Sequence, residues 1–203
     1  MSFRTVAQLD LNRTDVSRDL ADRDRMHKRL MSLYPDGLGD NPRQAINLLF
    51  TANAITGELL FQSDLPPVVG PLKDARNGYF TKVITQPIAE CLEFNDGDTV
   101  EYRLWFAAQE RQTGTGKRVS VVDPEAVSAK AAAVLSRCGL QVTSMRIDDS
   151  QEIKSARRKI KYTNIEFVGQ GHVTSAADLT QAIQIGVGSG RLWGSGVLLV
   201  NPT

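Results

Sequence analysis

The sequence is poor in cysteine and histidine, the side chains that most often build metal sites. Its 203 residues contain two cysteines, Cys91 and Cys138, and two histidines, His27 and His172. The two cysteines lie far apart, and neither has a second thiol or a histidine at the spacing of a metal-ligand set. We therefore expect no zinc site and no other metal or cofactor, and we expect both cysteines to be small buried hydrophobic residues.

Long hydrophobic runs and a strong net charge are also absent. No apolar run approaches the roughly 18 residues that would span a bilayer, and residues 1–4 lack the cationic and then apolar layout of a secretion signal. We therefore expect a cytoplasmic protein with no membrane partner. The formal net charge is +1, which decides nothing about nucleic acid, because a basic face can coexist with acidic residues elsewhere.

The residues that are present are typical of a globular protein, with 41% hydrophobic and 23% charged side chains. The length allows one domain or two of about 100 residues each. In the first half, strands are predicted at residues 3–11, 46–52, 58–62 and 80–84. One helix is predicted from Ser17 to Leu33, because apolar residues recur there at helical spacing and Pro35 and Gly37 follow.

The second half repeats this alternation of strands and helices. Helices are predicted at residues 124–138, between Pro124 and Gly139, and at 175–185, capped by Ser175 or Asp178. Strands are predicted at residues 100–108, 118–122, 141–147, 160–168 and 197–200. This order indicates an α+β protein of two tandem ferredoxin-like (RRM-like) βαββαβ domains, at residues 1–90 and 97–203.

A glycine-rich segment near the C-terminus is the most unusual feature. Residues 186–196 hold five glycines in eleven positions, and such a segment suits a loop whose N–H groups face a phosphate. It fails the dinucleotide fingerprint, because Arg191 stands where the third glycine is needed, and residues 114–118 fail the P-loop pattern. A tight connection between a helix and a strand is the alternative. Arg191 and Trp193 favour a loop that faces RNA.

A second candidate lies on the first helix. His27 sits at the edge of the apolar face, and four cations lie within a turn of it and would attract a phosphate. Lone histidines on helices are more often structural or solvated than catalytic. If a histidine acts as an acid or base, we expect His27 rather than His172, which falls in a predicted strand.

A third candidate is a basic run that leads into a predicted strand. Residues 154–161 carry five cations in eight positions; such runs are often solvated loops, but a strand would hold these cations in a row suited to phosphates. Lys117 and Arg118 form a smaller candidate of the same kind. Together these residues predict a basic surface on a nearly neutral protein.

Taken together, the motifs resemble the CasE family, the CRISPR repeat-processing endoribonucleases of type I-E Cascade systems. The C-terminal match is Gly-apolar-Gly, a cation three residues later, and Gly-x-Gly followed by paired aliphatics; it is carried by Gly186, Val187, Gly188, Arg191, Trp193, Gly194, Gly196, Val197 and Leu198. The N-terminal match is a helix histidine before an aromatic-proline stop, carried by His27, Leu30, Leu33, Tyr34 and Pro35. Lys117-Arg118-Val119 and Phe167-x-Gly169 also resemble family segments.

The resemblance implies a metal-independent nuclease that binds the stem-loop of CRISPR repeat RNA in precursor crRNA and cuts at the base of the stem. The 2′-hydroxyl would attack the adjacent phosphate, leaving a 5′-hydroxyl and a 2′,3′-cyclic or 3′-phosphate end. The protein would stay bound as a Cascade subunit and would be a monomer when isolated. His27 would be catalytic; RNA would be bound by Lys28, Arg29, Lys117, Arg118, Arg157, Arg158, Lys159, Lys161, Gly186, Gly188, Arg191 and Gly194.

Two departures from the family pattern leave alternatives open. Some members carry a tyrosine one helical turn before the histidine, where this chain has Asp24. The second catalytic group is therefore open: Asp24 either orients His27 and raises its pKa, or faces solvent. Ser189 replaces a position that is often basic, so a phosphate contact would be weaker here. A noncatalytic RNA-binding subunit of the same fold is the main alternative, and an enzyme acting on a small phosphate compound is a third.

Overall fold

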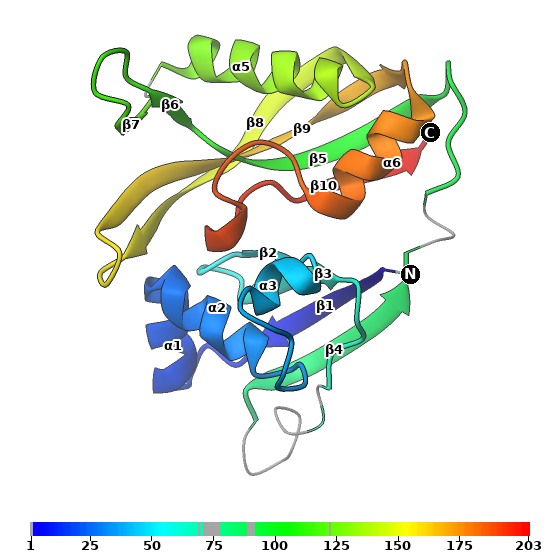
Figure 1. Cartoon of the computed structure of the whole chain (residues 1–203). Helices are drawn as coiled ribbons and strands as arrows, with labels where there is room; N and C mark the ends of the chain where they lie inside the picture. Colours follow the sequence, from blue (N-terminus) through cyan, green and yellow to red (C-terminus); the bar gives the residue numbers. More distant parts are fainter. Residues whose placement is uncertain (1, 69, 71–77, 89–91, 122) are drawn as a thin grey trace. The chain divides into compact units, whose positions relative to one another are not determined.

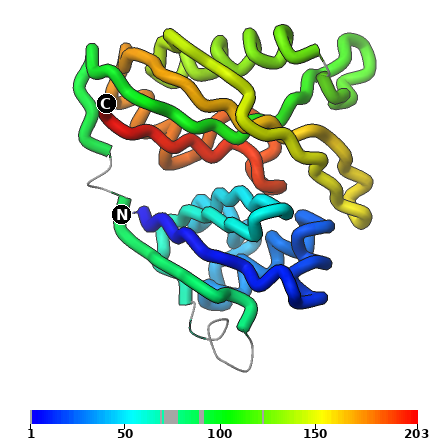
Figure 2. Tube along the Cα trace, turned by 180° about the vertical axis from the view of Figure 1, so that it is seen from behind, coloured from blue at the N-terminus to red at the C-terminus, as the bar shows by residue number. Residues whose placement is uncertain are grey.

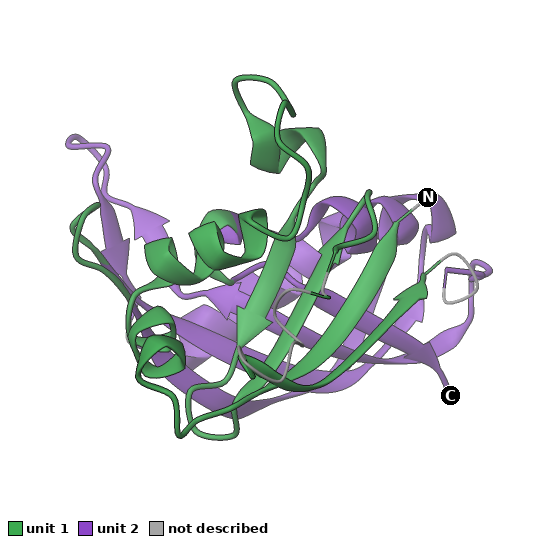
Figure 3. Cartoon of the chain, turned by 90° about the horizontal axis from the view of Figure 1, so that it is seen from below, with its two compact units in different colours: residues 1–90, 154–160, 192–194 green, residues 91–153, 161–191, 195–203 purple. Residues whose placement is uncertain are grey.

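The chain forms two compact units in a computed structural model that describes residues 2–68, 70, 78–88, 92–121 and 123–203. Unit 1 comprises residues 1–90, 154–160 and 192–194, and unit 2 comprises residues 91–153, 161–191 and 195–203 (Figure 3). Two short segments, residues 154–160 and 192–194, therefore belong to unit 1 although unit 2 flanks them in the sequence. Cys91 and Val122, which the sequence placed in the core and in a strand, lie outside the described residues.

Unit 1 has a four-stranded antiparallel sheet in the order β2-β3-β1-β4 (Figure 1). Its strands are β1 (Phe3–Leu9), β2 (Leu49–Ala52), β3 (Glu58–Ser63) and β4 (Phe80–Pro87). Period-2 alternation fixes the register of β1, because Thr5 and Ala7 are buried while Val6 between them is 42% exposed.

Three helices lie on one face of this sheet, as the front and rear views show together (Figures 1 and 2). They are α1 (Thr14–Ala21), α2 (Arg23–Met31) and the short α3 (Pro42–Ala45). Their buried side chains pack on those of the strands in one core: Ala7, Leu9, Val16, Leu20, Met26, Leu30, Leu33, Tyr34, Ile46, Leu48, Phe50, Ala52, Leu59, Phe61, Tyr79 and Phe80.

The prediction of one helix from Ser17 to Leu33 is wrong, because the chain breaks at Asp22. Asp22 has extended backbone angles (φ −132°, ψ 108°), and its carboxylate accepts a hydrogen bond from the N–H of Asp24 at 3.0 Å. It therefore ends α1 and caps the N-terminus of α2. Next to the break, Arg23 is buried and donates to the carbonyl of Ala52 at 2.7 Å. The break turns α2 into an independent helix that carries His27.

Unit 2 has a second four-stranded sheet, in the order β10-β5-β9-β8. The strands are β5 (Thr99–Ala107), β8 (Leu140–Ser155), β9 (Ile160–Val173) and β10 (Leu198–Pro202). Helices α5 (Pro124–Arg137) and α6 (Ala176–Ile185) lie on one face of it (Figures 1 and 2). A hairpin of β6 (Gln109–Arg111) and β7 (Arg118–Ser120) is inserted between β5 and α5, and a single 3-10 turn, η2 (Arg191–Trp193), precedes β10.

Both sheets place the fourth strand of the unit next to the first, and the third between the first and second. That is the strand order of a ferredoxin-like βαββαβ domain, so the predicted tandem ferredoxin-like fold is confirmed. The predicted helix signals also hold in unit 2. Asp123 accepts from the N–H of Ala126 at the start of α5, and Ser175 rather than Asp178 caps α6.

Two strands of unit 2 are much longer than predicted. β8 runs through residues 140–155 although most of its side chains are exposed, so it has no buried stripe that periodicity could detect. Cys138 is half-buried beside the core of unit 2, and burial raises the pKa of its thiol. Among the described residues, no helix has the length and apolar character needed to cross a membrane.

Candidate functional site

His27 projects from α2 and is half-buried in unit 1. Its Nδ1 atom is inaccessible to solvent and has no hydrogen-bond partner among the described residues. Burial, followed by the nearby charge of Arg43, lowers the pKa of the imidazole from 6.5 to about 4. His27 is therefore uncharged at neutral pH, which is the state required of a general base.

Asp24 lies one turn before His27 and is buried, so it does not simply face solvent. Its Oδ2 atom is 3.0 Å from Nζ of Lys28 and 3.9 Å from Nη1 of Arg157. The hydrogen bond from Lys28 is the main cause that lowers the pKa of Asp24, with smaller contributions from the charges of Arg157 and Arg158. The Asp24 carboxylate acts in turn to raise the pKa of His27, although burial and Arg43 outweigh it.

Arg157 and Arg158 reach this group from a distant part of the sequence. They lie in the turn at residues 156–159 between β8 and β9, within the segment that belongs to unit 1, and both are exposed. The charge of Arg158 acts on His27 and on Asp24. The fold thus brings together two of the three candidates, the helix histidine and the basic run, around a single imidazole.

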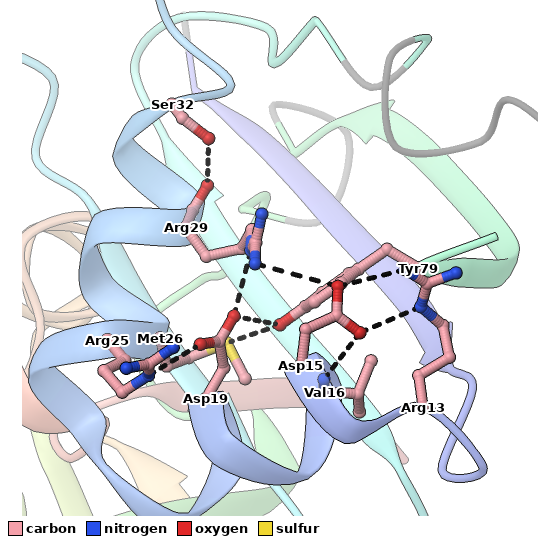
Figure 4. Close-up of polar contacts among 9 residues, drawn as sticks. All are labelled: Arg13, Asp15, Val16, Asp19, Arg25, Met26, Arg29, Ser32 and Tyr79. Atoms are coloured by element: carbon pink, nitrogen blue, oxygen red, sulfur yellow. Dashed lines mark hydrogen bonds and ion pairs between the residues drawn. The ribbon is translucent and has the colours of Figure 1, made fainter. Parts of the chain in front are cut away.

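Three other predicted RNA-binding cations have different surroundings. Lys159 is exposed at the left-handed position of the same turn (φ 52°). Lys161 belongs to unit 2 and pairs with Glu152 at 2.8 Å. Arg29 does not stand free on α2, because Nε donates to Asp19 at 2.9 Å and its guanidinium lies 4.7 Å from the centre of the Tyr79 ring (Figure 4).

The sequence did not single out Arg25 and Arg43 as members of the site. Arg25 forms an ion pair with Asp19 (Figure 4), and Arg43 is the cation with the largest effect on His27. The four-residue spacing of Arg25 and Arg29 was a signal that they share a helix face. Arg43 gave no such signal, since it lies on the short helix α3, which a loop separates from α2.

In unit 2, Arg118 lines a small pocket together with part of the glycine segment. The pocket has a volume of about 230 Å³, and its lining includes three cations, Arg111, Arg118 and Lys130, with Glu110, Gly188 and Ser189. Gly188 and Gly190 have positive φ angles of 70° and 80°, whereas Ser189 between them has a negative φ angle. Such alternation turns successive N–H groups to one side, which favours an anion. Lys117 is exposed in the same hairpin as Arg118.

Much of the glycine segment also closes the fold. Gly186 ends α6 and donates to the carbonyl of Ala182, and Nη1 of Arg191 donates to the carbonyl of Ile185 at 2.9 Å. A Cβ atom on Gly194 would lie 3.3 Å from the ring of Phe50, which also belongs to unit 1. Arg191 and Gly194 therefore have structural contacts besides any role in binding. Among the described residues, no three His, Cys, Asp or Glu side chains are grouped so that they could hold a metal ion.

The comparisons with known proteins agree with this architecture. A family model described as CRISPR associated protein matches residues 3–202. The chain is similar to the CRISPR endoribonuclease Cse3 bound to a 19-nucleotide RNA, with 22% identity, a TM-score of 0.85 and coverage of 100% of both chains. No curated protein matches the sequence.

Two further solved structures share the fold. One is the CRISPR-associated protein Cas6e from Escherichia coli str. K-12, with 19% identity, a TM-score of 0.66 and coverage of 100% of both chains. The other is a chain of a CRISPR RNA-guided surveillance complex in a pre-nicking state, with 21% identity, a TM-score of 0.66 and coverage of 99% of this chain and 100% of that one.

Proposed function

Since the chain belongs to the CRISPR associated protein family, we propose that it is an endoribonuclease that binds the stem-loop of a CRISPR repeat RNA. It cuts precursor crRNA once, at the base of the stem, without a metal ion. It then stays bound to its product as a subunit of a surveillance complex. The fold it shares with an RNA-bound endoribonuclease and with a chain of such a complex supports this assignment.

The observation that carries the proposal is the environment of His27. A half-buried imidazole with a pKa of about 4 stands in the same unit as Lys28, Arg157 and Arg158. A neutral base beside several cations suits the cleavage of a phosphodiester, because the base accepts a proton while the cations stabilise the added negative charge.

The reaction uses the RNA's own nucleophile. The 2′-hydroxyl oxygen attacks the adjacent phosphorus and gives its proton to the neutral imidazole of His27. The bond from phosphorus to the 5′ oxygen then breaks, and that oxygen takes a proton and leaves as a 5′-hydroxyl. The other product keeps the phosphate as a 2′,3′-cyclic ester. Every atom is accounted for by the RNA, His27 and solvent protons.

The remaining residues bind and position the RNA in this proposal. Asp24 holds Lys28 and Arg157 beside the imidazole, where they meet the scissile phosphate. Phosphates of the stem are bound by further cations and by the N–H groups of the glycine segment, namely Lys117, Arg118, Arg158, Lys159, Lys161, Gly186, Gly188, Arg191 and Gly194. The arrangement around Gly188 and Arg118 supports this second group.

Replacement of His27 tests the proposal. We expect His27→Ala to slow single-turnover cleavage of a repeat hairpin by roughly 10²–10⁴-fold, the usual contribution of a general acid or base. Binding of the hairpin, measured by electrophoretic shift, should be nearly unchanged. His172→Ala is the matched control, because it removes the chain's other histidine, which is exposed on β9.

Four outcomes would contradict the proposal in different ways. Full cleavage by His27→Ala would refute the catalytic role of His27. Binding of the repeat hairpin without any cleavage by the unaltered protein would favour the noncatalytic RNA-binding alternative. Equal binding of the repeat hairpin and a scrambled hairpin would remove the RNA specificity and favour an enzyme acting on a small phosphate compound. Cleavage that stops in EDTA and returns with magnesium would contradict the metal-independent mechanism.

A further inference from the structure

A buried carboxylate, Asp19, accepts a hydrogen bond from the Nε atom of each of two arginines of α2. Asp19 lies on α1 with 3% of its side chain exposed. It accepts hydrogen bonds from Nε of Arg25 at 3.3 Å and from Nε of Arg29 at 2.9 Å, one on each oxygen (Figure 4). The hydroxyl of Tyr79 donates to Asp19 at 3.0 Å as well.

Holding a guanidinium by Nε leaves its two Nη groups available for another acceptor. A guanidinium carries five N–H donors in a fixed plane, and only one of them is used by each bond to Asp19. The side chain of Arg25 is 51% exposed, and Nη2 of Arg29 is 3.9 Å from Asp15. Both arginines therefore present oriented donors that match the oxygens of a phosphate.

These donors meet in a pocket on the surface of unit 1. It has a volume of about 380 Å³ and is lined by Asp19, Arg25, Lys28, Arg29 and Ser32. The lining itself holds three cations and one carboxylate, and two further carboxylates contact its cations from outside the lining, since Lys28 pairs with Asp24 and Arg29 lies 3.9 Å from Asp15. An anion with several oxygens is the ligand that this lining fits.

Lys28 links the pocket to His27, because it lines the pocket and its charge also acts on the imidazole. At about 100° per residue, Arg25, Lys28, Arg29 and Ser32 share one side of the helix, whereas His27 lies about 160° round the helix from Arg25, with Lys28 between them. An RNA strand that passes Lys28 can thus place one phosphate near His27 and another, further along its backbone, over the arginines.

We propose that this pocket binds a backbone phosphate of the RNA strand that carries the scissile phosphate, and that Asp19 is the positioning residue that orients Arg25 and Arg29 to receive it. The proposal rests on the function proposed above. The ring of Tyr79 beneath Arg29 and the bonds to Asp19 order both guanidiniums before RNA arrives, so that little side-chain entropy is lost on binding.

A scan of RNA phosphates tests the pocket. A repeat hairpin with a 2′-deoxy sugar at the cleavage site is prepared in versions that each carry one neutral methylphosphonate linkage. For the unaltered protein, we expect about a 10-fold loss of affinity at one linkage other than the scissile one, the scale of a charge-assisted hydrogen bond. Arg25→Ala should lose a similar amount with unmodified RNA and lose nothing further at that linkage.

The control for this scan is Lys82→Ala. Lys82 is an exposed cation on β4, opposite Gln8 and on the sheet face away from the helices, and its replacement should leave the scan unchanged. The pocket is refuted if Arg25→Ala and the unaltered protein lose the same affinity at every linkage. If the unaltered protein does not bind the hairpin at all, the proposed function fails first and this proposal falls with it.

Replacement of Asp19 distinguishes its proposed role in orienting the two arginines from the effect of its negative charge on RNA binding. Asp19→Asn removes a negative charge next to a phosphate site, so charge alone predicts tighter RNA binding. If Asp19 orients the arginines, binding should instead weaken several-fold, while Asp15→Asn, which removes a carboxylate bonded mainly to Arg13, should tighten it. Tighter binding by both variants would refute the positioning role. Arg25→Ala, at an exposed position, provides the test if Asp19→Asn fails to fold.

Discussion

The glycine segment of residues 186–196 and helix α2 differ in how conspicuous they are in the sequence and in the contacts that they make in the structure. The glycine segment is the most conspicuous run in the chain, yet many of its polar groups bond within unit 2. The N–H of Val187 donates to the carbonyl of Gly196 at 2.7 Å, and the N–H of Gly196 donates to the carbonyl of Trp105 at 2.5 Å. Helix α2 has no comparable run of one residue type, but it carries His27, whose pKa is lowered, and charged side chains that pair with Asp24 and with Asp19.

The difference shows that backbone shape and side-chain chemistry are separate requirements. Glycines permit the tight path that joins α6 to β10, and only the stretch around Gly188 faces a basic pocket. On α2, carboxylates fix the positions of cations near an imidazole and in a surface pocket. Substitution of a glycine in this segment should therefore lower stability, whereas substitution of the charged residues on or beside α2 should weaken RNA binding and slow cleavage.

The largest effect is expected from Gly196→Ala. Gly196 has φ of 83°, and a Cβ atom there would lie 2.6 Å from the carbonyl oxygen of Val187. The strained backbone alone costs about 1–2 kcal/mol, and the collision adds to it. We expect a fall of at least about 2 kcal/mol in the free energy of unfolding of unit 2, measured by urea denaturation.

Gly97→Ala provides the matched control for that variant. Gly97 also lies in unit 2 and has φ of 94°, but no atom approaches its Cβ position within 4 Å. Only the backbone cost should remain, so this variant should lose less stability than Gly196→Ala. Equal stability of the two variants would mean that the glycine segment does not close the fold as described.

A smaller effect is expected when Arg157 and Arg158 are both changed to Ala. Because these cations stand beside His27, the variant should bind the repeat hairpin more weakly, with a salt slope shallower by about 2, and should also cut bound RNA more slowly. Changing Lys117 and Arg118 to Ala should weaken binding without slowing the cleavage of bound RNA. An unaltered salt slope in the first variant would move the RNA-binding face elsewhere.

The sequence predicted the order of strands and helices along the chain well, because each element leaves a local pattern. Apolar alternation marks β1, and proline and glycine mark the ends of α5. The break at Asp22 was missed, since aspartate is tolerated inside a helix and its capping bond to Asp24 appears only in the folded chain. The low pKa of His27 was also inaccessible to sequence, because it depends on burial and on Arg43, which the fold brings close.

The same limit explains Asp19. Its spacing from Arg25 and Arg29 crosses a helix break, so no helical projection places the three side chains together. Their bonds depend on the angle between α1 and α2 and on Tyr79, which approaches from a position 60 residues away in the chain. Long-range charge networks of this kind are fixed by tertiary packing rather than by residue spacing.

The pH dependence of kcat/KM for cleavage of the repeat hairpin tests the central claim most directly, because it reports the free enzyme. Burial and Arg43 keep His27 neutral, so the rate should stay level from neutral pH downward and fall only as the pH approaches about 4. Arg43→Gln should move this acid limb upward, toward 6.5, and circular dichroism at each pH checks that the protein stays folded. An acid limb at or above 6.5 in the unaltered protein, or the same profile and rate in His27→Ala, would contradict the account.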